Sequence, residues 1–418
     1  MQFRFSNFGK KLGGPCGIQE LMDDLGQAMT SDPAMRMLGG GNPAHIPEIA
    51  AVWRARMREL LEDGGAFDKM LGNYDPPRGN PAFLSALADC LNEACGWNLT
   101  PANLAVTPGG QAGWFMLFNL LAGQHADGKR RKILLPLVPE YIGYENQGLE
   151  PGFFQACRPI IEELPGRVFK YRVDFPAVEA ALGDDIAALC VSRPTNPSGN
   201  VLTDAEVARL AELARAHGIP LLLDNAYGLP FPGAIFTEAT PVWDENIVLT
   251  LSLSKLGLPG TRTGIVVARP EIASAVQAMT SVIGLANTNT GQALALPLLR
   301  GGEIIRLSRE IVRPFYEERS RRAQEWAHAA FAGLDYGIHR SEGAFFLWLR
   351  FAGLPITTRE LYQRLKLRKV LVVPGEYFFF GLGEDWQHSR ECVRMTFSQS
   401  PEVVREGIEI IADEVRRL

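Results

Sequence analysis

Short apolar runs alternate with amphipathic stretches between about residues 100 and 270. Within this region, stretches such as 204–217 repeat apolar residues at helical spacing. Strands that alternate with helices in this way are typical of a parallel sheet covered by helices, so we expect an open α/β domain. The apolar runs that predict its strands lie at 104–107, 132–137, 187–191, 220–223, 247–251 and 264–267.

The C-terminal part of the chain has a different pattern, which predicts a smaller α+β domain. We therefore expect an N-terminal arm with part of the small domain over residues 1–47, a large domain over 48–310 and a small domain over 311–418. The elements predicted beyond residue 299 are one long helix at 303–332, a strand at 344–349, a helix at 358–365, and strands at 370–373 and 393–397.

Composition and charge narrow the class of protein. Of the 418 residues, 46% are hydrophobic and 21% are charged, which excludes disordered, collagen-like and coiled-coil chains. The 42 basic and 47 acidic residues give a net charge of -5, and the basic residues form only one short run, at 129–132. We therefore expect small-molecule substrates rather than nucleic acid or a membrane surface.

Targeting, disulfide and metal motifs are not found. The N-terminus lacks an apolar stretch of about 7–15 residues, and no window holds about 18 consecutive apolar residues, so we expect a cytoplasmic protein. The six cysteines show no CxxC spacing and the six histidines no HExxH pair. We expect buried free thiols, structural histidines and no metal site.

A lysine follows the apolar run at 247–251. In a desolvated cleft the pKa of the Lys255 ammonium would fall, and the amine could then attack a carbonyl carbon. Ser252, Ser254 and Arg262, which flank it, could hold a phosphate. Taken alone, a solvent-facing lysine in a loop is the simpler interpretation.

The run at 220–223 ends in a carboxylate. Asp224 at the end of a buried strand needs a cationic or hydrogen-bonding partner, and a protonated pyridine nitrogen would serve. Tyr227 follows three residues later. A helix N-cap explains Asp224 equally well when the residue is taken singly.

Three further strand ends carry polar or aromatic residues. Asn196 lies in the turn RPTNPSGN, where asparagine is usually structural. Gly110 and Gln111 follow a strand and open a helix, which is where a phosphate binds well. Tyr141 lies just beyond another strand, and its ring could stack on a planar group or simply pack in the core.

Together these strand ends match the needs of one cofactor, pyridoxal 5'-phosphate. Its aldehyde needs an amine, its pyridine nitrogen a carboxylate, its phenolic oxygen an amide or phenol, and its phosphate a glycine turn with hydroxyls and a guanidinium. A dinucleotide site is the obvious rival for a parallel sheet, but no GxGxxG follows a strand and no Walker A motif occurs. We therefore predict a site for pyridoxal 5'-phosphate.

The ordered motifs resemble those of the fold-type I aminotransferases across essentially the whole chain. They are GGGNP, NYDPPRGN, PGGQ, PEYIGY, PTNPSGN, DNAYG, SLSKLGLPGTRTG and VRMTF. The resemblance implies a large domain with a mainly parallel central sheet and a smaller α+β domain. It also implies a homodimer with each active site between the subunits.

The resemblance also implies a role for each matching residue. Lys255 is similar to the family's Schiff-base lysine and proton shuttle, and Asp224 to the carboxylate that keeps the pyridine nitrogen protonated. Asn196 and Tyr227 resemble the pair on the ring hydroxyl, and Tyr141 the stacking aromatic residue. The phosphate cup is similar over Gly110, Gln111, Ser252, Ser254 and Arg262.

Three further positions follow from the same resemblance. Tyr74 is similar to the tyrosine that reaches the phosphate from the neighbouring subunit, and Arg394 to the arginine that grips the substrate α-carboxylate bidentately. Gly41, like Tyr141 and Asn196, resembles a position that lies against the substrate. Gly110 departs from the family because many relatives have a hydroxyl residue there, which leaves more of the phosphate binding to the backbone.

Narrower motifs indicate the substrates. The stretches GGGNPAHIPE, DNAYGLPFPG and ITTRELYQRLK resemble members that exchange amino groups between valine and pyruvate. Residues 281–299 contain no Arg or Lys, so we expect aspartate and glutamate to be poor donors, although Asn287 could reach the cofactor site. The alternatives are another aminotransferase or a C–S β-lyase of the same fold. A ligand-sensing regulator would need a DNA-binding module, for which the residues before GGGNP are too few.

Overall fold

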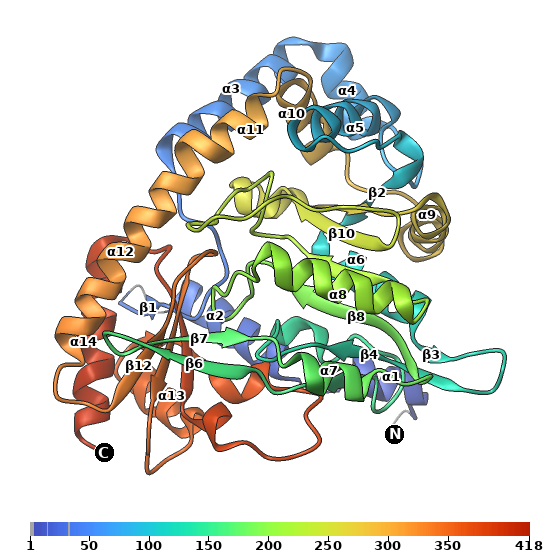
Figure 1. Cartoon of the computed structure of the whole chain (residues 1–418). Helices are drawn as coiled ribbons and strands as arrows, with labels where there is room; N and C mark the ends of the chain where they lie inside the picture. Colours follow the sequence, from blue (N-terminus) through green and yellow to red (C-terminus); the bar gives the residue numbers. More distant parts are fainter. Residues whose placement is uncertain (1–3, 15, 32–33) are drawn as a thin grey trace. The chain divides into compact units, whose positions relative to one another are not determined.

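The computed structural model describes residues 4–14, 16–31 and 34–418, without the side chains of residues 25 and 27–31. These residues form two compact units, each assembled from separate stretches of chain (Figure 1). The first unit contains Met1–Gly41, Leu121–Leu202 and Glu318–Leu418, and the second contains Asn42–Leu120 and Thr203–Glu317. The linear boundaries expected at 47/48 and 310/311 stay a prediction.

The second unit contains four strands in the order β2, β11, β10, β9. These are β2 (Leu104–Pro108), β9 (Leu221–Asp224), β10 (Ile247–Ser252) and β11 (Thr263–Val267), so the strands expected here are confirmed to within one residue at each end. β9 and β10 are parallel, but β11 is antiparallel to both of its neighbours. The connection from β10 to β11 spans only residues 253–262, which is too short for the crossover that a parallel pair needs.

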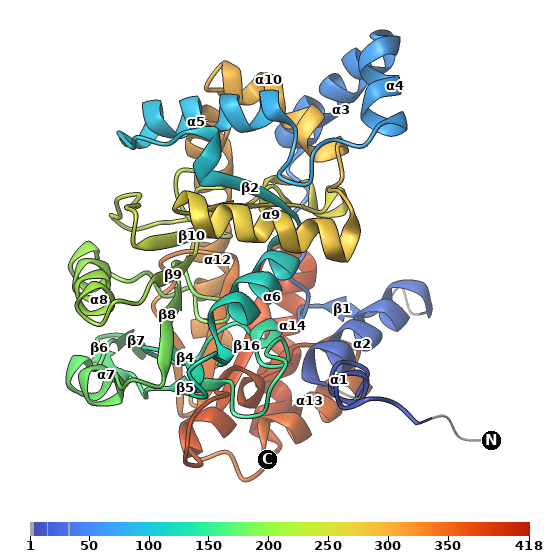
Figure 2. The ribbon, with the colours of Figure 1, turned by 90° about the vertical axis from the view of Figure 1, so that its right-hand side faces the viewer.

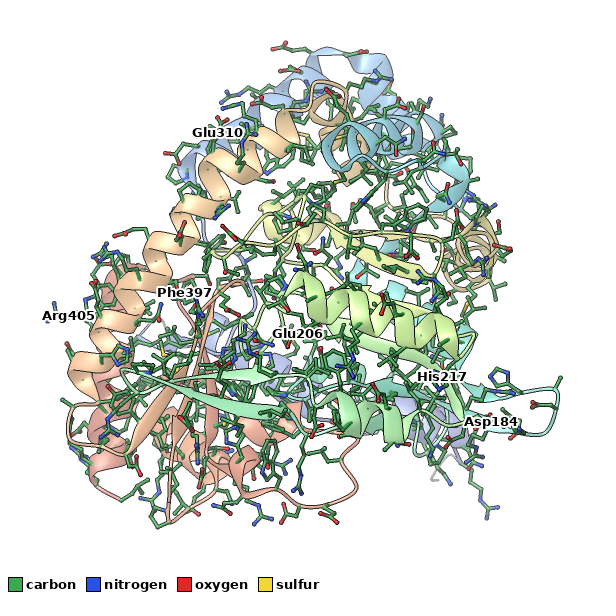
Figure 3. The ribbon with its side chains drawn as sticks, viewed as in Figure 1. Asp184, Glu206, His217, Glu310, Phe397 and Arg405 are labelled. Atoms are coloured by element: carbon green, nitrogen blue, oxygen red, sulfur yellow. The ribbon has the colours of Figure 1, made fainter. Side chains whose placement is uncertain are left out.

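Helices cover this sheet. Figure 2 shows α9 (Pro270–Gly284) running along β2, and α5 (Pro81–Cys95) beside α10 (Thr290–Arg300). The helix expected at 204–217 is α8 (Asp204–Ala216), which begins with a capping box and ends at His217 (Figure 3). The unit also contains α3 (Pro47–Glu62), α4 (Gly64–Gly72), α6 (Gly110–Leu121) and α11 (Glu303–Leu307).

The long helix expected at 303–332 is present over residues 303–330, but it is not α-helical throughout. A π-helical segment, Ser308–Val312, separates α11 from α12 (Arg313–Ala330). Proline explains the interruption, because Pro314 has no backbone N–H and its ring would clash with the carbonyl of residue 310 in a regular α-helix. Glu310 of this segment is exposed and pairs with Arg306 (Figure 3).

The described part of the first unit contains a two-stranded pair, given below, and two larger groups of strands. In one group, β4 (Arg130–Leu135) is parallel to β8 (Ile186–Ser192) and β5 (Phe154–Ala156), and antiparallel to β3 (Gly123–Gln124). The other is a six-stranded sheet in the order β15, β16, β13, β12, β7, β6. Its members are β6 (Ile160–Leu164), β7 (Val168–Arg172), β12 (Tyr336–His339), β13 (Phe346–Phe351), β15 (Val373–Pro374) and β16 (Cys392–Thr396).

The hairpin of β6 and β7 was not expected from the sequence. β6 is antiparallel to β7, and its residues are partly exposed. No continuous apolar run therefore marks β6 in the sequence. The predicted C-terminal strands and helix are confirmed as β13, β16 and α13 (Thr358–Leu367), except that the strand expected at 370–373 is divided into β14 (Val370–Leu371) and β15. β14 pairs with β1 (Arg36–Met37).

The remaining helices of the first unit are α1 (Asn7–Leu12), α2 (Gly17–Ser31), α7 (Phe175–Ala181) and α14 (Pro401–Arg416). None of the six cysteines, all of which lie in described residues, forms a disulfide; four are buried, and Cys16 and Cys95 are partly exposed. Over the described part of the chain, no helix is long and apolar enough to cross a membrane. In the same residues, no cluster of His, Cys, Asp and Glu has the arrangement of a metal site.

Candidate active site

Lys255 lies in a short helical turn (Ser254–Leu256) directly after β10 in the second unit. Its Nζ atom is 5.2 Å from the centroid of the Tyr227 ring. The side chain is half-buried and lines a cavity of about 170 Å³. The simple interpretation of a solvent-facing loop lysine is therefore wrong.

The walls of this cavity are mostly apolar and are held in place by two buried hydrogen bonds. The backbone N–H of Ala44 donates to the Tyr316 hydroxyl at 2.8 Å, and Trp53 Nε1 donates to the Leu256 carbonyl at 2.7 Å. The first bond ties the segment after GGGNP to the start of α12, and the second ties α3 to the lysine turn. Other lining residues include Pro43, Ile46, Ile49, Pro259 and Val312.

Asp224 ends β9 and is 8% exposed. Its Oδ1 atom accepts hydrogen bonds from the Ala226 N–H at 2.9 Å and the Thr250 hydroxyl at 3.3 Å. No helix begins here, because residues 225–246, which the structure describes in full, form turns and irregular structure. The N-cap interpretation of Asp224 is therefore wrong, and a protonated pyridine nitrogen would be a strong further partner for this carboxylate.

The turn that starts α6 lies against the Arg262 guanidinium. Gly109 has φ 87°, a conformation that favours glycine, and a Cβ atom there would displace the Arg262 guanidinium. Arg262 itself has φ 49°, a left-handed conformation that costs roughly 1–2 kcal/mol in an L-residue. A guanidinium beside the N-terminal turn of a helix is a favourable environment for an anion such as a phosphate.

The hydroxyl residues of the predicted phosphate cup lie around the end of β10. Ser252 Oγ accepts a hydrogen bond from the Ser254 N–H at 3.1 Å, and both residues are buried. Gly110 is the first residue of α6 and Gln111 the second. The structure thus places Gly110 and Arg262 beside the same turn, and Ser252, Ser254 and Lys255 in one short segment.

Tyr74 lies in the loop between α4 and α5, and it is 82% exposed. The loop is firmly held, since Arg78 donates through Nε to Gln277 at 2.7 Å and through Nη1 to the Ala102 carbonyl at 2.9 Å. A ring that packs so little on its own chain is suited to a contact with another molecule. Its contact with the partner's phosphate stays a prediction.

In the first unit, Arg394 and Asn196 form a hydrogen-bonded pair. Arg394 Nη1 donates to Asn196 Oδ1 at 2.7 Å, and Nη2 donates to the Gly39 carbonyl at 2.6 Å. The guanidinium is 3% exposed and lies 4.3 Å and 5.3 Å from the ring centroids of Phe346 and Phe378. Its plane is therefore fixed, as bidentate binding of a carboxylate requires.

A buried carboxylate that the sequence did not single out lies next to Tyr141. Glu140 accepts hydrogen bonds from the Ser192 N–H at 2.7 Å, the Ser192 hydroxyl at 2.6 Å and the Tyr141 N–H at 3.2 Å. Glu140 thereby joins the segment that carries Tyr141 to the end of β8, which leads into the Asn196 turn. Glu140 could have been singled out from the sequence, because it is the one acidic residue in the otherwise mostly apolar stretch PLVPEYIGY.

A buried ion pair braces the other end of the Asn196 turn. Lys170 and Glu342, both nearly inaccessible to solvent, are paired. Lys170 Nζ also donates to Asn200 Oδ1 and the Val201 carbonyl, each at 3.1 Å, and the Val201 N–H donates to Glu342 at 3.0 Å. No local pattern predicted this pair, because its two residues lie on β7 and beyond β12.

The buried histidines of this unit have structural surroundings. Burial lowers the pKa of His339 to about 3 and that of His388 to about 3. His388 Nε2 lies 2.5 Å from the Tyr171 hydroxyl, which accepts a hydrogen bond from Trp348 Nε1 at 2.8 Å. His388, Tyr171 and Trp348 therefore form one buried polar network in the first unit.

The predicted site residues thus fall into two sets, one in each unit. The first unit carries Asn196, Arg394, Tyr141 and Gly41, and Arg394 contacts the Gly39 carbonyl, a position that the sequence did not single out. The second unit carries Lys255, Asp224, Tyr227, Gly110, Gln111, Ser252, Ser254, Arg262 and Tyr74. Their individual roles stay predictions.

Comparison with known proteins adds independent information. The family model for aminotransferases of class I and II matches residues 152–411. Among characterised proteins, the chain is similar to valine–pyruvate aminotransferase of Escherichia coli (strain K12), with 47% identity over 99% of this chain and 98% of that protein.

Solved structures agree with this. A putative amino-acid aminotransferase from Psychrobacter arcticum 273-4 has a TM-score of 0.97 and 45% identity, over 100% of this chain and 99% of that one. Valine–pyruvate aminotransferase from Salmonella typhimurium LT2 has a TM-score of 0.88 and 45% identity, over 96% of this chain and 99% of that one. The likeness therefore extends over both units.

Proposed function

Because the chain belongs to the class I and II aminotransferases, which depend on pyridoxal 5'-phosphate, we propose that it transfers the amino group of valine to pyruvate. The products are 2-oxoisovalerate and alanine, and similar small aliphatic amino acids would also serve as donors. The observation that carries this choice of substrates is the 47% identity with the E. coli valine–pyruvate enzyme over nearly the full length of both chains.

The residues of the second unit fit the cofactor. A half-buried lysine beside a cavity suits the aldehyde, the buried carboxylate of Asp224 suits a protonated ring nitrogen, and the guanidinium of Arg262 at the start of α6 suits the phosphate. When bound, the cofactor draws electron density away from the Cα–H bond of the amino acid. Binding, orientation and proton transfer are carried out by side chains of the protein.

Lys255 is the residue that would bind the cofactor covalently and would move a proton during the reaction. Its Nζ would take the proton from the substrate Cα and deliver it to the cofactor carbon that accepts the amino group. Asp224 holds the proton on the pyridine nitrogen. We assign Tyr227 and Asn196 to the ring oxygen of the cofactor, and Tyr141 to the face of its ring.

The phosphate of the cofactor would be bound separately from its ring. We assign its binding to the N-terminal turn of α6, to the serines after β10 and to Arg262. The partner's Tyr74 completes the cup. The residues of its own chain are Gly110, Gln111, Ser252, Ser254 and Arg262.

Arg394 binds the α-carboxylate that every amino and keto acid substrate shares. Its bonds to Asn196 and Gly39 and its two flanking rings fix the fork before substrate arrives, which reduces the entropy lost on binding. Gly41 lies two residues beyond Gly39, and we assign its backbone to the substrate side of this arginine.

Specificity for small aliphatic side chains follows from a lack of cations. Dicarboxylate substrates need a second positive charge, which relatives often supply from the segment before the long helix. In this chain residues 281–299 hold no Arg or Lys, and the next cation, Arg300, is exposed at the end of α10. A buried carboxylate without a counter-ion is strongly disfavoured.

We further propose a cytoplasmic homodimer. The second unit exposes several large apolar side chains, of which Val282 is 88% exposed and Leu71, Ile283 and Leu285 more than half. Exposed apolar side chains of this size would be covered by contact with a second copy. Tyr74 belongs to the same unit, so the same contact would bring it to the partner's phosphate.

The test is an assay with purified, cofactor-loaded protein. Valine labelled with ¹⁵N at its amino group is incubated with pyruvate, and labelled alanine should form in equal amount with 2-oxoisovalerate. The Lys255→Ala variant is the control. Release of pyruvate and a thiol from a cysteine conjugate, without formation of alanine, would instead indicate a C–S β-lyase.

A further inference from the structure

We propose that two adjacent residues, Thr288 and Asn289, position different cofactor sites of the dimer. Thr288 serves the phosphate cup of its own chain, and Asn289 serves that of the partner subunit. The inference rests on the proposed function, because it uses Arg262 as a phosphate ligand in its own chain and Tyr74 as a phosphate ligand across the dimer.

The contacts of Thr288 lead to Arg262. Its hydroxyl donates to the Thr261 carbonyl at 2.7 Å and lies 3.5 Å from the Arg262 carbonyl. These carbonyls flank Arg262, whose φ of 49° is rarely adopted by an L-residue. Because the direction of the guanidinium depends on this unusual backbone, a hydroxyl that holds both peptide groups helps to keep Arg262 against Gly109.

The contacts of Asn289 lead to Tyr74. Asn289 Nδ2 donates to the Asn73 carbonyl at 2.9 Å, directly before Tyr74. On the other side of the tyrosine, Asn287 Nδ2 donates to the Pro77 carbonyl at 2.7 Å. Two side-chain amides of one loop therefore hold the backbone at both ends of the tyrosine segment.

The exposure of Tyr74 makes these clamps important. With 82% of its surface accessible, the ring obtains little support from packing on its own chain. The orientation of the Tyr74 side chain is therefore set by the backbone on either side of this residue. Neither Asn289 nor Thr288 contacts the cofactor in this scheme, so each is a positioning residue.

Hybrid dimers separate the two roles. One subunit carries Lys255→Ala and is inactive at its own site, so the remaining active site uses Lys255 and Arg262 of the unmodified subunit and Tyr74 of the inactive one. Asn289→Ala is introduced either into the active subunit or into the inactive one, and Thr288→Val is introduced in the same two ways, which gives four hybrid dimers. The apo hybrids are then titrated with pyridoxal 5'-phosphate and followed by visible absorption and by activity.

Asn289→Ala in the inactive subunit should raise the Kd of the active site for cofactor about three- to tenfold, as expected for one lost hydrogen bond. In the active subunit it should have little effect. Thr288→Val should show the reverse dependence. At saturating cofactor, kcat should stay close to that of the parent hybrid in all four dimers, because no reacting group has been removed.

Matched controls test whether any lost bond has the same effect. Asn246→Ala removes an amide-to-carbonyl bond to Ile219 of 3.0 Å, and Ser281→Ala removes a hydroxyl-to-carbonyl bond to Gln277 of 3.0 Å, both in the second unit. Neither should change the Kd. If Asn289→Ala lowers the Tm, Asn289→Asp is used in its place, because it keeps the size of the side chain but cannot donate the hydrogen bond. Asn289→Gln keeps the amide and tests whether the affinity for cofactor is restored.

Equal effects of Asn289→Ala in the two subunits, or an effect confined to its own chain's site, would overturn the assignment. Tyr74→Phe in the same hybrids identifies which premise failed. If Tyr74→Phe acts across the dimer but Asn289→Ala does not, the positioning role is wrong while the proposed function stands. If Tyr74→Phe acts on its own chain's site, both the crossed placement of Tyr74 and the inference from it are wrong.

Discussion

Arg394 Nη1 donates a 2.7 Å hydrogen bond to Oδ1 of Asn196, although the two residues lie 198 positions apart in the chain. The bond connects the middle of β16 to the turn after β8, and it holds the planar guanidinium in one orientation. Under the proposed function, it also links the group that binds the substrate carboxylate to the group that binds the ring oxygen of the cofactor.

Arg394→Lys should raise the KM for both valine and pyruvate by about 10- to 100-fold. Lysine keeps the charge but cannot make the bidentate contact or the simultaneous bonds to Asn196 and Gly39. Steady-state kinetics measure the change, and the absorption of bound cofactor should be retained. An unaltered KM for both substrates would show that another cation binds the carboxylate.

Lys255→Ala should lose the covalent cofactor and transamination together. Borohydride reduction of the wild-type protein followed by peptide mapping should find the label on Lys255. Lys366→Ala, which removes a partly buried ion pair with Asp24 in the first unit, is the matched control and should keep full activity. Label on any other lysine would refute the assignment.

Asp224→Asn should leave the fold almost unchanged but reduce kcat by about two to three orders of magnitude. The amide oxygen can still accept the bonds from Ala226 and Thr250, which preserves the local structure. A neutral amide cannot hold the proton on the ring nitrogen, however. Circular dichroism and single-turnover kinetics test the two parts, and near-normal turnover would contradict the role.

Valine should be a far better donor than aspartate with pyruvate as acceptor, by a factor on the order of a thousand in kcat/KM. The reason is the lack of any cation in residues 281–299. Comparison of the two kcat/KM values decides the question. Similar values would mean that an arginine from elsewhere serves the side-chain pocket.

Stability should fall as the pH is lowered from about 6.5 towards 3, in part because of His388. Burial lowers the pKa of folded His388 to about 3, so over this range the unfolded chain binds one more proton at this residue. This contributes about 1.4 kcal/mol per pH unit to the slope of unfolding free energy, with stability rising as pH rises. Urea unfolding of His388→Gln at several pH values should show a shallower dependence of the unfolding free energy on pH than the wild-type protein.

The residues at the strand ends were predictable from the sequence because their signals are local. An apolar run followed by a lysine or a carboxylate indicates both a strand and the position of its end. The structure has such strands at β9 and β10. The ordered motifs likewise identified the family, since each motif is a contiguous stretch of residues. The same local character allowed α8 to be placed from its cap and periodicity.

Only the tertiary structure decided which distant residues meet. Glu140 with Ser192, Lys170 with Glu342, and Arg394 with Gly39 are contacts between segments whose separation along the chain leaves no periodic trace. The same reason explains why β6 and β7 join the sheet of the C-terminal strands. The sequence by itself therefore determined the strand ends, the chemistry of the residues there and the family. The partners that hold those residues in place were decided by long-range packing, which depends on burial and on the pairing of polar groups in three dimensions.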